Sequence, residues 1–84
     1  MIFVYAIKSL KKDWIYVGMS DDVARLLKEH NLGQNKSTKP YLPFELFFNE
    51  KFTDRKAGRK AEKYYKSAAG KRKLRKMFRG LGPV

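Results

Sequence analysis

The most constraining feature of the sequence is a short N-terminal segment that is apolar on both of its sides. Residues Ile2–Lys8 are rich in β-branched and aromatic side chains, which is typical of a buried strand. The polar turn Ser9–Asp13 separates this segment from a second apolar one, Trp14–Gly18, and the short spacing predicts an antiparallel hairpin. Because a buried strand needs cover, we expect helices packed against the sheet that contains it.

Periodicity and turn residues predict the middle of the chain. Apolar residues spaced at i, i+3, i+4 and i+7 indicate a helix over residues 23–30, with Ser20 or Asp21 as its N-cap. The polar segment Gly33–Pro43 contains two prolines and predicts a loop, and Phe44–Asn49 predicts a third strand.

Two basic helices are predicted in the C-terminal part. Thr53 can cap the first, Ala68-Ala69-Gly70 weakens or breaks it, and Lys71–Arg79 forms the second. Their expected inward-facing residues are Ala57, Ala61, Tyr64, Tyr65 and Ala68 in the first, and Leu74, Met77, Phe78 and Leu81 in the second. The order β-β-α-β-α-α predicts an α+β sandwich, a small three-stranded antiparallel sheet flanked by three helices. We expect one domain over residues 1–79 and a tail over residues 80–84.

Composition excludes several classes of protein. The 84 residues suffice for one small domain, and without cysteine there is no disulfide scaffold and no thiolate site. A zinc site built on two or three histidines is excluded because His30 is the single histidine. The longest apolar run, Met1–Ile7, is too short to span a membrane and has no basic residue before it. We therefore expect no signal peptide, no membrane insertion and a cytoplasmic location.

Positive charge is concentrated in the C-terminal part of the chain. The formal net charge is +12, and residues 51–84 hold thirteen Lys and Arg against only Asp54 and Glu62. Such an imbalance favours a polyanionic partner, most often nucleic acid. A solvated helix face and an anionic membrane surface are the alternatives, although an apolar helix face free to enter a membrane is not expected here.

Two tyrosines occupy the centres of the paired strands. Tyr5 and Tyr16 lie on neighbouring strands and are expected to be close, which taken alone most often means cross-strand packing. Gly18 follows the second strand, where a missing side chain permits close approach of a ligand or is simply a turn glycine. His30 closes the first helix, where the helix dipole alone could satisfy it. Glu62 could simply form an ion pair with Lys66 one helical turn later.

Several short motifs occur together in one order along the chain. They are Phe3-Val4-Tyr5, Tyr16-Val17-Gly18, Asp22-Val23, Lys28-Glu29-His30-Asn31, Asn35-Lys36-Ser37-Thr38-Lys39-Pro40, and Ala57 followed by Glu62. In this order and spacing the chain resembles the GIY-YIG endonuclease superfamily, from about Phe3 to Met77. It is most similar to small stand-alone bacterial members, which are similar to the N-terminal nuclease domain of excinuclease C subunits.

The resemblance implies Mg²⁺-dependent, structure-selective hydrolysis of DNA phosphodiester bonds. Glu62 would be the single carboxylate that holds Mg²⁺, or Mn²⁺, with water and phosphate oxygens completing the coordination. Tyr5 and Tyr16 would position or deprotonate the attacking water, and His30 would contact phosphate or relay a proton.

The chain departs from the family pattern at one position. The family's catalytic arginine falls ten residues after the second motif tyrosine, which is Leu26 here. Arg25 lies one position earlier, about 100° around the helix, and is the candidate stand-in, with Lys28 as another cation that could substitute. Without a cation on the scissile phosphate, cleavage would be weak or absent. The alternative function is therefore a catalytically inactive nucleic-acid-binding module on the same fold. A third possibility is a basic accessory or interaction protein that binds RNA or another DNA-repair factor.

Basic residues of the loop and of the last two helices are expected to contact phosphates. Such contacts confer affinity and salt dependence but no sequence specificity. The predicted contact residues are Lys36, Ser37, Lys39, Arg59, Lys63, Lys66, Lys71 and Arg72. DNA is favoured over RNA as the partner, while the sequence identifies no protein partner and leaves the oligomeric state open.

Overall fold

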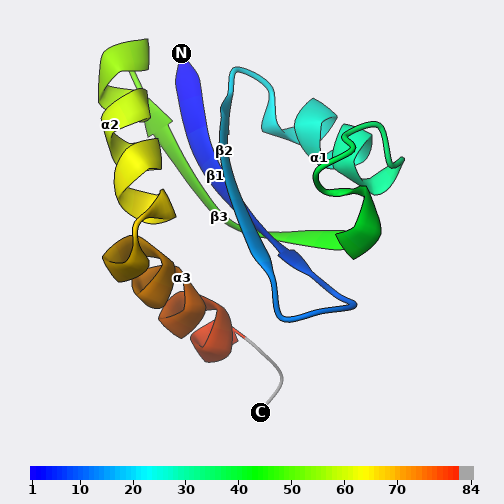
Figure 1. Cartoon of the computed structure of the whole chain (residues 1–84). Helices are drawn as coiled ribbons and strands as arrows, with labels where there is room; N and C mark the ends of the chain where they lie inside the picture. The colour runs from blue at the N-terminus through cyan, green and yellow to red at the C-terminus, as the bar shows by residue number, and fades with distance from the viewer. Residues whose placement is uncertain (82–84) are drawn as a thin grey trace.

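The computed structural model describes residues 1–81, without the side chains of residues 79–81. Three antiparallel strands form one sheet in the order β2-β1-β3, and their bounds are Ile2–Ser9 for β1, Ile15–Ser20 for β2 and Phe44–Phe52 for β3 (Figure 1). The strand that is apolar on both sides is therefore the central one. This explains its composition, because a central strand covered on both faces exposes neither set of side chains.

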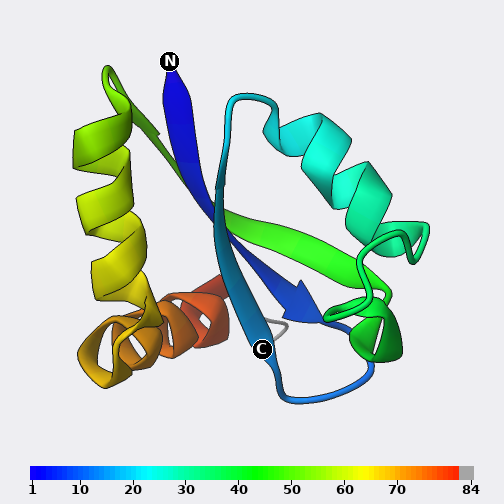
Figure 2. The ribbon, with the colours of Figure 1, turned by 45° about the horizontal axis from the view of Figure 1, so that its top comes forward.

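Helices cover both faces of this sheet. Helix α1 (Val23–Asn31) lies on one side, and α2 (Arg55–Lys66) and α3 (Ala68–Leu81) lie on the other (Figure 2). A short 3₁₀ turn, η1 (Lys39–Tyr41), leads into β3. The predicted α+β class, the three-stranded antiparallel sheet and the order β-β-α-β-α-α are confirmed.

Alternation along β1 divides the core in two. Val4 and Ala6 pack toward α2 and α3, in a cluster that includes Leu74. Tyr5 and Ile7 point to the opposite face and pack with residues of α1 and of the start of β3. Each side chain goes to one face because successive residues of a strand point in opposite directions.

Aspartates, rather than the predicted residues, cap the first two helices. The Asp22 carboxylate accepts the Arg25 backbone N–H at 3.0 Å, and the Asp54 carboxylate accepts the Ala57 N–H at 2.7 Å. Ser20 instead accepts the Asp22 N–H in the preceding turn, at 2.9 Å. The expected caps at Ser20 or Asp21 and at Thr53 were therefore wrong by one or two positions, because several adjacent residues have capping side chains.

The break between α2 and α3 falls at Ser67, whose backbone is extended. The Ser67 hydroxyl accepts the Gly70 N–H at 3.2 Å, so residues 68–70 form the first turn of α3 and do not interrupt a helix. At Gly70 the backbone passes so close to Tyr64 that a Cβ would overlap the Tyr64 carbonyl group. The predicted break at 68–70 is corrected accordingly, and Ala68, which it placed on the inward face of α2, is exposed in α3.

Other details of the last two helices also differ from expectation. Tyr64 was expected to face inward but is 45% exposed, because Tyr65 takes the buried position of that turn. Helix α3 continues to Leu81, so the tail predicted over residues 80–84 does not begin at Gly80. Residues 82–84 and the inward position predicted for the Leu81 side chain lie outside the described part. No described helix has the length and apolar character needed to cross a membrane.

Candidate active site

Tyr5 extends from the central strand over a residue that has no side chain. It pairs with Gly18 of β2, and a Cβ built at Gly18 would lie 2.5 Å from the Tyr5 hydroxyl oxygen. Any larger residue at position 18 would therefore displace the phenol. This close approach, rather than a turn, is what requires glycine in the second motif.

His30 joins the tyrosines from the last turn of α1. Its Nε2 lies 3.2 Å from the Tyr5 hydroxyl, and its Nδ1 lies 2.8 Å from the Thr38 hydroxyl. The Tyr16 ring centroid is 5.1 Å from that of His30 and 6.4 Å from that of Tyr5. The structure thus brings together three of the five predicted catalytic residues, Tyr5, Tyr16 and His30.

Burial keeps two members of this cluster uncharged. It lowers the pKa of His30, which neighbouring Glu29 only partly opposes. Burial also raises the pKa of Tyr5 well above its usual value, and the charges of Tyr16, Glu62 and Glu29 raise it further. A protonated phenol therefore faces a neutral imidazole near pH 7, an arrangement suited to hydrogen bonding and proton relay.

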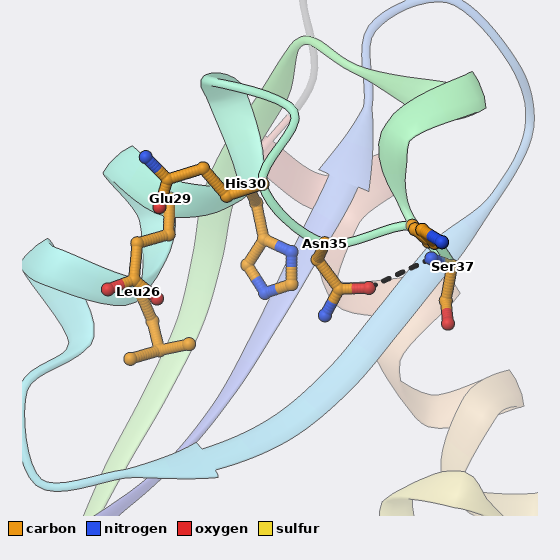
Figure 3. Close-up of a pocket in the computed structure, with 7 residues that line it drawn as sticks. Leu26, Glu29, His30, Asn35 and Ser37 are labelled. Atoms are coloured by element: carbon orange, nitrogen blue, oxygen red, sulfur yellow. Dashed lines mark hydrogen bonds between the residues drawn. The ribbon is translucent and has the colours of Figure 1, made fainter.

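A cavity of about 480 Å³ opens beside His30, between α1 and the following loop (Figure 3). The residues that line it are Leu26, Glu29, His30, Gln34, Asn35, Lys36 and Ser37. Tyr5 is 2% exposed and does not line this cavity. Of the three clustered residues, His30 lines the cavity and therefore lies between it and the two tyrosines.

Leu26 forms part of the cavity wall, whereas Arg25 does not. The guanidinium of Arg25 binds Glu29 at 3.0 Å, Asp21 at 3.4 Å and Asp22 at 3.9 Å, on an exposed part of α1. One of these carboxylates, Glu29, lines the cavity, whereas the Arg25 side chain is not part of the lining. The structure therefore does not bring Arg25 to the place that Leu26 occupies, and Lys28 is likewise exposed and absent from the cavity lining.

Glu62 lies on α2, which packs on the opposite face of the sheet from α1. Its carboxylate is nevertheless close enough to contribute to the raised pKa of Tyr5. Lys66 binds it at 3.3 Å, so the ion pair expected of a helix surface does form. Within the described residues no group of three or more His, Cys, Asp and Glu side chains could hold a metal ion, so Glu62 is not part of such a cluster.

The predicted phosphate contacts fall into three groups. Lys36 and Ser37 line the cavity, and Lys39 is exposed at the start of η1. Arg59, Lys63 and Lys66 are exposed on α2, and Arg72 is exposed on α3, where it lines a second hollow.

Lys71 is the exception among these cations. Its ammonium donates to the Ile15 carbonyl at 2.9 Å, and burial, followed by Arg75 and Lys66, lowers its pKa. The structure therefore gives Lys71 a contact that joins α3 to β2.

The sequence places Thr38 and Asn31 in the motifs, and Thr38 among loop residues that could bind a phosphate, but it does not predict the contacts that the two side chains make. Thr38 is fully buried and contacts His30, and Asn31 binds both the N–H and the carbonyl of Phe44 through its side chain, at 2.6 and 3.3 Å. A loop has no periodicity to separate Thr38 from its neighbour Ser37. The available signal was its place in a short motif after His30, which did not distinguish the buried hydroxyl from the exposed one.

Comparison with known proteins identifies the family of the chain. The model of the GIY-YIG catalytic domain matches residues 1–76. The UPF0213 protein YazA of Bacillus subtilis is 36% identical over 72 residues, which cover 84% of this chain and 72% of YazA. The UPF0213 protein SAG0778 of Streptococcus agalactiae serotype V is 34% identical over 61 residues, which cover 71% of this chain and 69% of that protein. No solved structure matches the chain significantly.

These relatives have names that state no activity, whereas the domain match covers nearly the whole chain and both tyrosine motifs. The fold, the facing tyrosines and the matched domain agree, and the chain belongs to the GIY-YIG family, a family of nucleases.

Proposed function

We propose that this protein is a Mg²⁺- or Mn²⁺-dependent, structure-selective DNA endonuclease whose cleavage is attenuated at Leu26. The observation that carries the proposal is the convergence of Tyr5, Tyr16 and His30 beside a cavity that cationic Lys36 also lines. The exposed cations of α2 and α3 support a nucleic-acid partner, and phosphate contacts of this kind select shape rather than sequence.

Glu62 fits a metal site of the one-carboxylate type. Mg²⁺ keeps several waters and often binds through one or two carboxylates together with substrate phosphates. The Glu62 side chain is 21% exposed, and its partner Lys66 is 52% exposed and can move away. When bound, the ion would neutralise charge on the phosphate and act as a Lewis acid.

The remaining roles follow from the protonation states. Tyr5, kept protonated by burial, orients groups through its hydroxyl, and the Tyr16 ring packs against His30. Neutral His30 can accept a proton at Nε2, the atom that faces Tyr5. Lys36 is the lysine that lines the same cavity as Leu26.

A second function is favoured by the leucine itself. Leu26 places an apolar side chain where the family has its arginine, and Arg25 is held by three carboxylates. Loss of one charge-stabilising donor costs about 10²–10³-fold in rate. A protein that binds nucleic acid on this fold without cleaving it is therefore the alternative.

Cleavage of a labelled panel of single-stranded, duplex, flap and branched DNA in Mg²⁺ tests the two functions. We expect slow cleavage by the native protein, none after Glu62→Ala or in EDTA, and faster cleavage after Leu26→Arg. Competition with RNA of the same shapes tests the preference for DNA.

Matched controls separate site effects from charge effects. Glu50→Ala removes an exposed carboxylate from β3 and should leave cleavage unchanged. Leu32→Arg adds the same charge at a residue that is 63% exposed and outside the cavity lining. If Leu26→Arg alone creates cleavage, the native protein is the binding module, and if Glu62→Ala cleaves as well as the native protein, the endonuclease assignment fails.

A further inference from the structure

The buried contacts of His30 form a chain of hydrogen bonds with a fixed end. The Thr38 hydroxyl lies 3.4 Å from the Asn35 carbonyl and 2.8 Å from His30 Nδ1, and His30 Nε2 lies 3.2 Å from the Tyr5 hydroxyl. Tyr5, His30 and Thr38 are each at most 2% exposed. Water therefore has little access to replace any of these bonds.

The end of the chain determines its direction. A backbone carbonyl only accepts, and that of Asn35 also accepts the N–H groups of Thr38 and Lys39, so when the Thr38 hydroxyl donates to it the hydroxyl oxygen is left to accept from His30 Nδ1. Nε2 is then unprotonated and accepts from Tyr5. In this direction the protons on the Thr38 hydroxyl, on His30 Nδ1 and on the Tyr5 hydroxyl each have an acceptor.

The reverse direction satisfies fewer groups. Thr38 would donate to Nδ1 and Nε2 to Tyr5, which leaves the Tyr5 hydroxyl proton without an acceptor in the described structure. Leaving a buried donor unpaired is costly, so the Nδ1-protonated tautomer is favoured.

We infer that Thr38 is a positioning residue, which holds His30 in the Nδ1-protonated tautomer and leaves Nε2 as the acceptor for the Tyr5 hydroxyl. Its role in cleavage rests on the proposed endonuclease function, whereas the tautomer itself does not. In cleavage this orientation directs the Tyr5 hydroxyl proton to Nε2 and leaves the phenol oxygen free to accept a hydrogen bond.

The loop that carries Thr38 is fixed at its far end, which makes such positioning feasible. The Tyr41 N–H bonds to the Thr38 carbonyl at 2.9 Å, and the Tyr41 carbonyl accepts the Ser9 hydroxyl at 2.6 Å. The Tyr41 ring also stacks on Trp14, with centroids 4.0 Å apart. The hairpin turn thus holds the loop against the sheet.

Nitrogen-15 NMR of histidine-labelled protein tests the inference directly, because His30 is the single histidine and gives one pair of ring signals. In the native protein near pH 7.5, without metal or DNA, we expect Nδ1 protonated and Nε2 unprotonated. Thr38→Val should raise the Nε2-protonated population, and Thr38→Ser should restore the native signals. Thr53→Val, the same change at an exposed threonine outside the site, should leave the signals unchanged. Cleavage should fall about 10-fold or more in Thr38→Val and recover in Thr38→Ser.

The outcomes separate the two proposals. Native protein with Nε2 protonated overturns the inference whatever the variants do, so it stays testable even where Thr38→Val does not fold. A folded Thr38→Val variant with native signals overturns it as well. Native protein with the expected tautomer but no cleavage of any substrate refutes the endonuclease function and leaves the assigned tautomer intact.

Discussion

The two faces of the sheet differ in what they bury. On the side of α2 and α3, the core around Val4, Ala6 and Leu74 is hydrophobic. On the side of α1, Tyr5, His30 and Thr38 are buried with polar atoms, and no buried side-chain nitrogen or oxygen of the described residues lacks a partner. The central strand β1 supplies side chains to both faces. Because successive side chains alternate, one face forms a hydrophobic core and the other contains the buried polar residues of the candidate site.

The largest expected effect is a loss of stability from a substitution in the hydrophobic core under α2 and α3. Leu74 is 0% exposed, and Leu74→Ala should lower the free energy of unfolding by about 3 kcal/mol through lost burial and a residual cavity. Urea denaturation measures this, with Leu74→Met as the volume-conserving control at about 1.5 kcal/mol or less. A loss below about 1 kcal/mol for the alanine variant would contradict this account of the core.

An intermediate effect is expected from a substitution at Gly18, which Tyr5 approaches closely. Gly18→Ala should cost about 1–3 kcal/mol, because the new methyl group meets the Tyr5 hydroxyl and ring. The Tyr5–His30 hydrogen bond should be lost, which the His30 ring signals in NMR report. DNA binding by the distant cations should persist, and unchanged His30 signals in a folded variant would refute the close approach.

Acidification should lower the stability of the protein through the buried His30 on the α1 side of the sheet. Burial lowers the pKa of His30 in the folded protein, so the unfolded chain takes up a proton more readily. The stability from neutral His30 is present above the unfolded value of about 6.5 and decreases as pH falls below it. Thermal melts between pH 7.5 and 5 should show a decrease in Tm that is smaller in His30→Gln, and equal decreases would show that His30 is not responsible.

The smallest effects on stability come from the exposed cations. Lys63→Ala and Arg72→Ala should each reduce the salt dependence of DNA binding by about one counterion while changing stability by about 0.5 kcal/mol or less. Fluorescence anisotropy at several salt concentrations measures the slope. Lys11→Ala, in the exposed hairpin turn, should leave it unchanged, and a slope equally reduced by all three variants would mean that binding is not localised.

The sequence predicted the architecture because the pattern of apolar residues extends over whole strands and helices. The hairpin, the third strand and the paired tyrosines follow from apolar patterning, and the resemblance to the GIY-YIG family is confirmed. The caps and the helix junction were misplaced because Asp22, Asp54 and Ser67 compete with neighbours of equal propensity. The hydrogen bond between Thr38 and His30 was not predicted because it depends on how the loop folds back, which local sequence does not determine.

The contact at Gly70 has a consequence for the geometry of the charged surface. Since α3 begins against the Tyr64 carbonyl, a backbone contact sets the angle between two rows of cations, one on each helix. If the proposed nucleic-acid partner contacts both rows, their spacing must match the separation of the phosphates that they bind. A side chain at position 70 would alter that spacing without removing any charge, so Gly70→Ala should change the relative affinities for duplex and branched DNA more than the salt slope for either.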